Sequence, residues 1–228
     1  MTTPNFDIEQ LEPSRLFLLA ESTETDGTLL DLIVKYYLTD EPLLEKVVRN
    51  PHVEQTTLNY IRLFGPPGIL SFLDTLNGPH ADPISDLEIQ QRRVATIGQL
   101  RVPEKIQLAL KGNREARSLL IRDANRTVAL AVLQSPKLTE DEVERIVQSR
   151  NVSEDVLRVI SRDSAWRKNY AIRDALTSNP KTPLAISMGF LKELRGADVD
   201  RLAKDKGVPS ALRTAAGRMI ATKNLRRT

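Results

Sequence analysis

Apolar residues recur along this chain at spacings of three and four, and no segment of useful length alternates apolar and polar positions with a period of two. Spacings of three and four place apolar side chains on one face of a helix, whereas a period of two is typical of a strand. The pattern therefore predicts an all-α protein made of short helices. In the first third of the chain we expect helices over residues 12–20, 28–38, 42–49, 53–63 and 66–76.

The clearest interruption of this pattern is the stretch NGPHADP at 77–83, in which a glycine and two prolines disfavour helix. Charge also changes near this point. Residues 1–90 carry 5 Lys+Arg against 15 Asp+Glu, whereas residues 91–228 carry 28 against 15. We therefore predict an acidic helical region over 1–76, a Pro/Gly linker over 77–83 and a basic helical repeat domain over 84–228. The opposite charges indicate either distinct partners or attraction between the two parts.

The turns between the predicted helices resemble one another. NPHV at 50–53, SPKLT at 135–139 and NPKTP at 179–183 each begin with Asn or Ser followed by Pro. The prolines of the last two turns are 44 residues apart, and those of the first two are 85 apart, close to twice that period. A helical unit that recurs in this way is typical of an α-solenoid, in which each unit buries its apolar face against the next.

The segments VALAVLQSPKL at 128–138 and AIRDALTSNPKTP at 171–183 resemble the HEAT-like and leucine-rich-variant helical repeats. The likeness covers about residues 103–220, with a weaker echo at 44–61, and the run over 111–188 also looks like a group of largely uncharacterised bacterial solenoid proteins. This resemblance implies a fold of short antiparallel helices and implies little about activity. Leucine-rich-variant proteins can carry a cysteine-bound iron–sulfur cluster, and that role does not transfer to a chain without Cys.

Composition narrows the possible functions. Without Cys, the chain forms no disulfide and no zinc site based on thiolates, and its 2 His are too few for a His-rich metal site. We expect no cofactor. The N-terminal residues lack a basic segment followed by an apolar one, so we expect no secretory signal. The longest apolar stretches fall short of the roughly 20 residues that span a bilayer. A soluble cytoplasmic protein is therefore expected.

Basic side chains in the C-terminal part form the main candidate binding surface. On the predicted helices over 114–122 and 154–161, apolar residues share one face and the arginines point away from it. If the units stack, these cations would line one side and bind phosphates or an acidic protein. The alternatives are a solvated face balanced by neighbouring carboxylates and, for Trp166, a space-filling role between two helices. The candidate binding residues are Arg114, Arg117, Arg122, Arg126, Arg158, Arg162, Trp166, Arg167, Lys168 and Tyr170.

Groups suited to catalysis are sparse. His52 follows an Asn-Pro turn and His80 lies in the interruption at 77–83. The segment GPPG at 65–68 contains two residues without an amide proton, so it is expected to form a turn and not a phosphate-binding loop. Asp198 and Asp200 are a weak Mg²⁺ candidate and are better explained as caps of the helix that follows. We therefore predict no catalytic residue and no metal site.

These observations favour a non-enzymatic interaction scaffold or regulatory binding module that presents an extended face to a protein with an acidic surface. The alternative is a HEAT-like nucleic-acid-binding protein. HEAT-like architecture also includes DNA glycosylases that excise alkylated purines, although no motif here matches them residue by residue. The segment over 28–38 is apolar on more than one face, so it is either buried within the protein or forms a homodimer interface.

Overall fold

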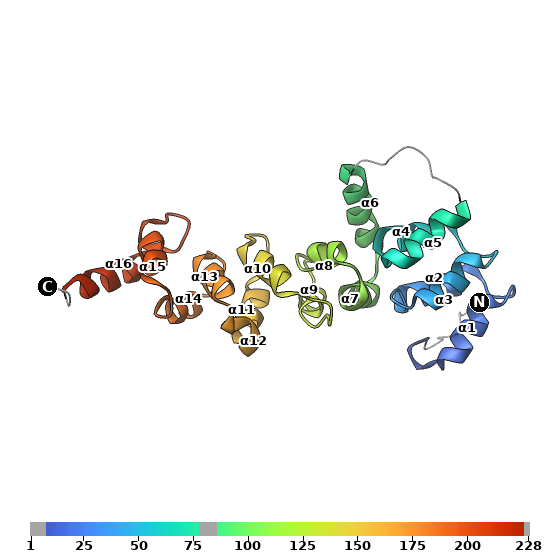
Figure 1. The fold of residues 1–228 in the computed structure, drawn as a ribbon, viewed down its shortest axis with the longest axis horizontal. Helices are drawn as coiled ribbons and strands as arrows, with labels where there is room; N and C mark the ends of the chain where they lie inside the picture. The colour runs from blue at the N-terminus through green and yellow to red at the C-terminus, as the bar shows by residue number, and fades with distance from the viewer. Residues whose placement is uncertain (1–7, 78–85, 226–228) are drawn as a thin grey trace. The chain divides into compact units, whose positions relative to one another are not determined.

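The computed structural model describes residues 8–77 and 86–225, and within these two ranges every regular element is a helix and no strand occurs (Figure 1). The prediction of an all-α chain is therefore confirmed. The five helices expected in the first third are present, and their ends lie within two residues of the expected ones. None of the described helices is long and apolar enough to cross a membrane.

Contacts between elements divide the chain into two compact units. The first unit comprises the residues up to Leu120 together with Ser135–Lys137, and the second comprises Ile121–Gln134 and the residues from Leu138 onward. The helices that follow the 77–83 stretch, through Leu120, thus group with the helices that precede it. Residues 78–83 lie outside the described ranges, so the linker stays a prediction.

The helices of the first unit begin where the sequence supplies capping groups. Asp26 and Asp40 accept hydrogen bonds from the backbone amides of Leu29 and Leu43 at 2.9 and 3.1 Å. A carboxylate at these positions satisfies a free amide and faces the positive end of the helix dipole. The elements are η1 (Ile8–Gln10), α1 (Pro13–Glu21), α2 (Gly27–Tyr36), α3 (Glu41–Arg49), α4 (Gln55–Phe64), α5 (Pro67–Asn77), α6 (Asp86–Gln99), α7 (Val102–Lys111) and α8 (Arg114–Leu120).

Within the first unit, four pairs of helices with one helix between them in the sequence pack together: α1 with α3, α2 with α4, α3 with α5, and α4 with α6. Helix α2 also packs on α1, α3 and α7, so its apolar residues are covered from several sides. Leu30, Ile33 and Val34 of α2 are fully buried. Packing within the unit therefore accounts for the apolar character of 28–38.

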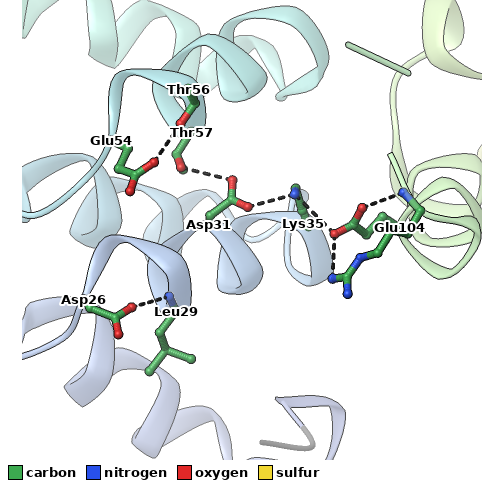
Figure 2. A network of polar contacts seen from close by, with 9 residues as sticks. Asp26, Leu29, Asp31, Lys35, Glu54, Thr56, Thr57 and Glu104 are labelled. Carbon is green, nitrogen blue, oxygen red and sulfur yellow. Dashed lines mark hydrogen bonds and ion pairs between the residues drawn. The ribbon is translucent and has the colours of Figure 1, made fainter. Parts of the chain in front are cut away.

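A network of polar side chains links α2, α4 and α7 in the first unit (Figure 2). Lys35 Nζ lies 2.8 Å from the Asp31 carboxylate and 3.3 Å from that of Glu104, and Thr57 Oγ1 donates to Asp31 at 3.1 Å. Glu104 also accepts a hydrogen bond from the backbone N–H of Arg101 at 2.8 Å. Burial raises the pKa of Glu104, but the bonds from Arg101 and the charge of Lys35 outweigh burial and hold the pKa below its ordinary value. The network ties the start of α7 to α2.

Tyr60 of α4 lies close to this network and is 3 % exposed. Its ring packs on Phe64 at 5.1 Å between centroids, but its Oη has no hydrogen-bond partner among the described residues. Burial, followed by the charges of Asp31 and Glu104, raises the pKa of the phenol well above its ordinary value. The hydroxyl thus stays protonated, and a buried donor without an acceptor lowers the stability of the fold.

The second unit continues with short helices. Thr139 and Glu142 form a capping box at the start of α10: the Thr139 N–H donates to the Glu142 carboxylate at 3.1 Å, and the Glu142 N–H donates to Thr139 Oγ1 at 3.4 Å. Helix α9 packs on α11, α10 on α13, α13 on α14, and both α14 and α15 pack on α16. The elements are α9 (Arg126–Val132), α10 (Glu140–Gln148), α11 (Glu154–Arg162), α12 (Ser164–Lys168), α13 (Tyr170–Ser178), α14 (Leu184–Leu191), α15 (Gly196–Lys204) and α16 (Ser210–Leu225).

Asn50, which begins the turn after α3, bonds back to the end of α1. Its Nδ2 donates to the carbonyl oxygens of Ala20 and Ser22, both at 2.9 Å. Its Oδ1 accepts from the backbone N–H of His52 at 2.9 Å, so the amide uses both its donor and its acceptor. Because carbonyls at the end of a helix lack partners within that helix, Asn50 satisfies groups of α1 while fixing the turn after α3.

The other two Asn/Ser-Pro turns do the same. Asn179 Nδ2 donates to the carbonyls of Val147 and Ser149 at the end of α10, at 2.5 and 3.1 Å. Ser135 Oγ donates to the carbonyl of Leu110, near the end of α7, at 2.8 Å. We call these contacts reach-back hydrogen bonds. They give the similarity of the three turns a shared structural role, which is to join a turn to the end of an earlier helix.

Candidate binding surface

The structure separates the ten candidate binding residues into two groups. Arg114 and Arg117 belong to the first unit, and the other eight belong to the second. Among those eight, Arg122, Arg162, Arg167 and Lys168 are exposed and form no ion pair with a described residue. Within the second unit, these four cations are the members of the predicted set that remain available to a partner.

Arg117 differs from the expectation that it points outward, because it is only 5 % exposed. Its guanidinium donates to the carbonyl oxygen of Gly112, the residue that caps the C-terminus of α7, at 2.9 Å. A long aliphatic stem can cover apolar surface while its charged end binds a helix-terminal carbonyl. Arg117 therefore holds α8 against the end of α7, whereas Arg114, the first residue of α8, is exposed.

Arg126 and Arg158 each lie beside a carboxylate. Arg126 Nε is 2.8 Å from Asp155, and Arg158 forms an ion pair with Glu154 one turn earlier on α11. All four side chains keep at least two fifths of their surface in contact with solvent, so each pair contributes at most about 1 kcal/mol to stability. These two arginines therefore fit the alternative considered from the sequence, a solvated face whose charges are balanced by neighbouring carboxylates.

Trp166 lies on α12, a helix of 5 residues that packs against α11 and α13. Its side chain is half-buried. Asp163 caps this helix by accepting hydrogen bonds from the backbone amides of Ala165 and Trp166 at 2.8 and 3.2 Å. Trp166 is therefore partly buried and partly accessible to solvent.

Tyr170 organises a cluster that spans the start of α13 and the start of α15. Its Oη donates to the Asp198 carboxylate and accepts from the backbone N–H of Arg195 at 3.0 Å. The guanidinium of Arg195 lies 4.4 Å from the centre of the ring, and that of Arg173 lies 5.7 Å from it. We call Tyr170, Arg173, Arg195 and Asp198 the Tyr170 cluster. Partial burial, and then the Asp198 hydrogen bond, raise the pKa of the phenol, so the hydroxyl remains a donor at neutral pH.

The Tyr170 cluster continues into a second arginine–carboxylate contact. Arg201 Nη2 lies 2.6 and 2.7 Å from the two carboxylate oxygens of Asp174 and 3.5 Å from Asp198. Burial raises the pKa of Asp174, with a further contribution from Asp198 that the charge of Arg201 opposes. Positive and negative side chains therefore alternate across this part of the surface.

Asp198 and Asp200 lie within α15 and do not cap it, because the helix begins at Gly196 with Arg195 at its N-cap. The expectation of a capping role is wrong, and Asp198 instead serves as the acceptor for Tyr170. Among the described residues, no group of three or more His, Cys, Asp or Glu side chains could hold a metal ion.

Helix α14 packs against α13, which carries Tyr170 and Arg173, and is apolar on nearly all sides. Its sequence, LAISMGFL, contains one polar side chain, yet Leu184 is 41 % exposed and Met188 is 36 % exposed. Phe190 faces inward, and the guanidinium of Arg167 lies 5.6 Å from its ring. A helix that is apolar all round is normally buried, so the exposure of Leu184 and Met188 is unusual for a helix of this composition.

Sequence reasoning did not include Arg195 and Arg201 among the candidates. Arg195 follows Tyr170 by 25 residues, and no local pattern indicates that the two side chains meet.

No protein-family model, curated protein or solved structure matches this chain.

Proposed function

We propose that this chain is a helical-repeat protein of the HEAT-like or leucine-rich-variant kind and that it acts as a non-enzymatic protein-binding module. The observation that carries this proposal is the Tyr170 cluster, in which arginines and carboxylates surround one aromatic ring next to the apolar helix α14. Interfaces between proteins combine aromatic and arginine side chains with an apolar centre.

The repeat architecture is supported by the reach-back hydrogen bonds. Asn50 and Asn179 lie 129 residues apart, close to three times the 44 residues between the prolines of the last two turns. Each bonds to the end of an earlier helix in its own unit. In a repeat of this kind, short antiparallel helices stack into a solenoid, and each turn occupies the same place in its repeat.

The mixed charge of the cluster favours a protein over a nucleic acid. Asp174, Asp198 and Glu193 lie among its arginines, and carboxylates repel a phosphate backbone. A protein partner can present acidic groups to Arg167 and Arg195 and avoid the carboxylates, because its own charges vary along the surface. The expected partner therefore carries an acidic patch with apolar residues at its centre.

Charge reversal tests this proposal. The double substitution Arg167→Glu with Arg195→Glu changes two exposed cations that contact aromatic rings. The matched control is Arg145→Glu with Arg150→Glu, which makes the same charge change at exposed positions outside both the candidate binding residues and the Tyr170 cluster. A partner is first isolated by affinity capture from cytoplasmic extract, and its affinity for each variant is then measured directly. The Arg167/Arg195 variant should bind the partner at least about tenfold more weakly than the control variant does.

Fluorescence anisotropy with duplex DNA, single-stranded DNA and RNA separates the alternative. Phosphate-driven binding with several contacts weakens by orders of magnitude between about 50 and about 200 mM salt. We expect no such tight, salt-dependent binding. If it occurs and the Arg167/Arg195 variant abolishes it, the protein-binding proposal fails and release of modified purines from alkylated DNA becomes the next assay.

A further inference from the structure

A second candidate site lies in the first unit, where a pocket of about 190 Å³ opens at the ends of α4 and α7. Its apolar lining includes Leu38, Phe64 and Pro66. The GPPG turn at 65–68 shapes one wall: Gly65 caps α4, and its N–H donates to the carbonyl oxygen of Ile61 at 2.7 Å. The turn therefore supplies shape and apolar surface, and polar recognition has to come from side chains.

Those side chains are cationic. Lys111, Arg114, Arg117 and Lys137 line the pocket, and none of the described residues that line it is acidic. All four belong to the basic part of the sequence over 91–228, whereas Leu38, Phe64 and Pro66 belong to the acidic part over 1–90. Four cations are thus gathered at one pocket, where like charges repel one another and an anion would be attracted.

The four cations divide into two fixed and two available ones. Arg117 donates to the Gly112 carbonyl, and Lys111 donates to the Tyr36 carbonyl, so the structure holds both in place. Arg114 and Lys137 are exposed and make no hydrogen bond or ion pair with a described residue. Available donors at the rim of an apolar pocket suit an anionic group, because a low-dielectric wall strengthens the attraction between opposite charges.

We propose that this pocket binds a carboxylate carried by an apolar group about the size of one amino-acid side chain. Its volume is below the roughly 300–1,000 Å³ of pockets that enclose drug-sized ligands. The apolar part would contact Pro66 and Pro67, and the carboxylate would bind Arg114 and Lys137. Both a free organic acid and the C-terminus of a polypeptide offer this chemistry. The site is independent of the proposed function, which concerns the second unit.

The test uses the full chain, a matched pair of probes with and without a carboxylate, and one further acid. N-acetyl-leucine carries the carboxylate, whereas N-acetyl-leucinamide has the same apolar side chain without it, and phenylacetate represents a free acid. Binding is followed by NMR through the backbone amides of Gly112 and Asn113, which line the pocket. We expect the acids to shift these signals with dissociation constants at or below about 10 mM, and the amide not to.

Variants then assign the binding to the rim cations. Arg114→Gln with Lys137→Gln should weaken binding of the acids roughly tenfold, because two charge-assisted contacts are lost; both positions are exposed. The matched control, Arg162→Gln with Lys168→Gln in the second unit, should leave binding unchanged. N-acetyl-leucine as the stronger ligand would indicate a chain terminus, and phenylacetate would indicate a free acid. Equal shifts with acid and amide, or no shift from either acid, would refute the proposal.

Discussion

Replacement of Asn179 by alanine tests the reach-back hydrogen bonds directly. The side chain is 4 % exposed, donates to the carbonyls of Val147 and Ser149, and accepts from the backbone N–H of Lys181 at 3.0 Å. Asn179→Ala therefore leaves two helix-end carbonyls and one turn amide without their partner. A buried polar group that loses its partner costs about 1–3 kcal/mol, and the three contacts share one side chain, so we expect a total loss of about 2–4 kcal/mol.

The assay is urea denaturation followed by circular dichroism, with the midpoint converted to a free energy of unfolding. In a thermal scan the same loss should lower Tm by roughly 5–15 °C. The matched control is Asn151→Ala, since Asn151 is exposed and its side chain forms no hydrogen bond with a described residue; it should change stability by less than about 0.5 kcal/mol. Equal effects of the two substitutions would show that the turn does not depend on the asparagine amide.

Four further substitutions are informative, each measured by the urea midpoint. The pKa of Glu104 in the folded protein lies below the unfolded value near 4.5, so its charged form stabilises the fold above pH 4.5, and this contribution is lost as pH falls through the folded pKa. Glu104→Gln should therefore flatten the dependence of the free energy of unfolding on pH between pH 7 and 3. An unchanged dependence would contradict the role of the network. Tyr60→Phe should raise the free energy of unfolding by up to about 1 kcal/mol, since it removes an unpaired buried hydroxyl, and a loss would indicate a partner for that group. Gly112→Ala should lower the free energy of unfolding by about 1–3 kcal/mol, because the added Cβ would lie 2.4 Å from a backbone carbonyl oxygen. Gly217 lies within α16 and a Cβ there would have nothing within 4 Å, so Gly217→Ala should raise the free energy of unfolding by about 0.5–1 kcal/mol. Similar effects of the two substitutions would refute this contrast.

Local features of this protein were predictable from the sequence because they depend on near neighbours. The 3.6-residue apolar period is strong in helices such as the one over 42–49, so its position could be predicted to within a residue. The similarity of the Asn/Ser-Pro turns also indicated a shared role before any contact was known. Which carbonyl each turn reaches, some 25 to 32 residues earlier, depends on packing and could not be predicted.

The candidate site was less predictable, for a physical reason. Helical periodicity places Arg117 on a face of α8 but does not state which neighbour covers that face, and α7 covers it. Arg195, at the N-cap of α15, contacts Tyr170, and Arg201, in the last turn of α15, contacts Asp174; contacts between helices so far apart in the sequence cannot be predicted from local spacing. Asp198 was misassigned because the helix begins earlier than an acidic cap would indicate.

The path of the chain between the two compact units limits how they can be separated. The chain leaves the first unit after Leu120, returns for Ser135–Lys137 and leaves again. A fragment that ends at Leu120 would therefore lack the hydroxyl that bonds the Leu110 carbonyl and the lysine that lines the pocket. No single cleavage therefore leaves both units complete, because residues 121–134 separate two segments of the first unit. A division of this protein by recombination would have to duplicate the segment over 121–137.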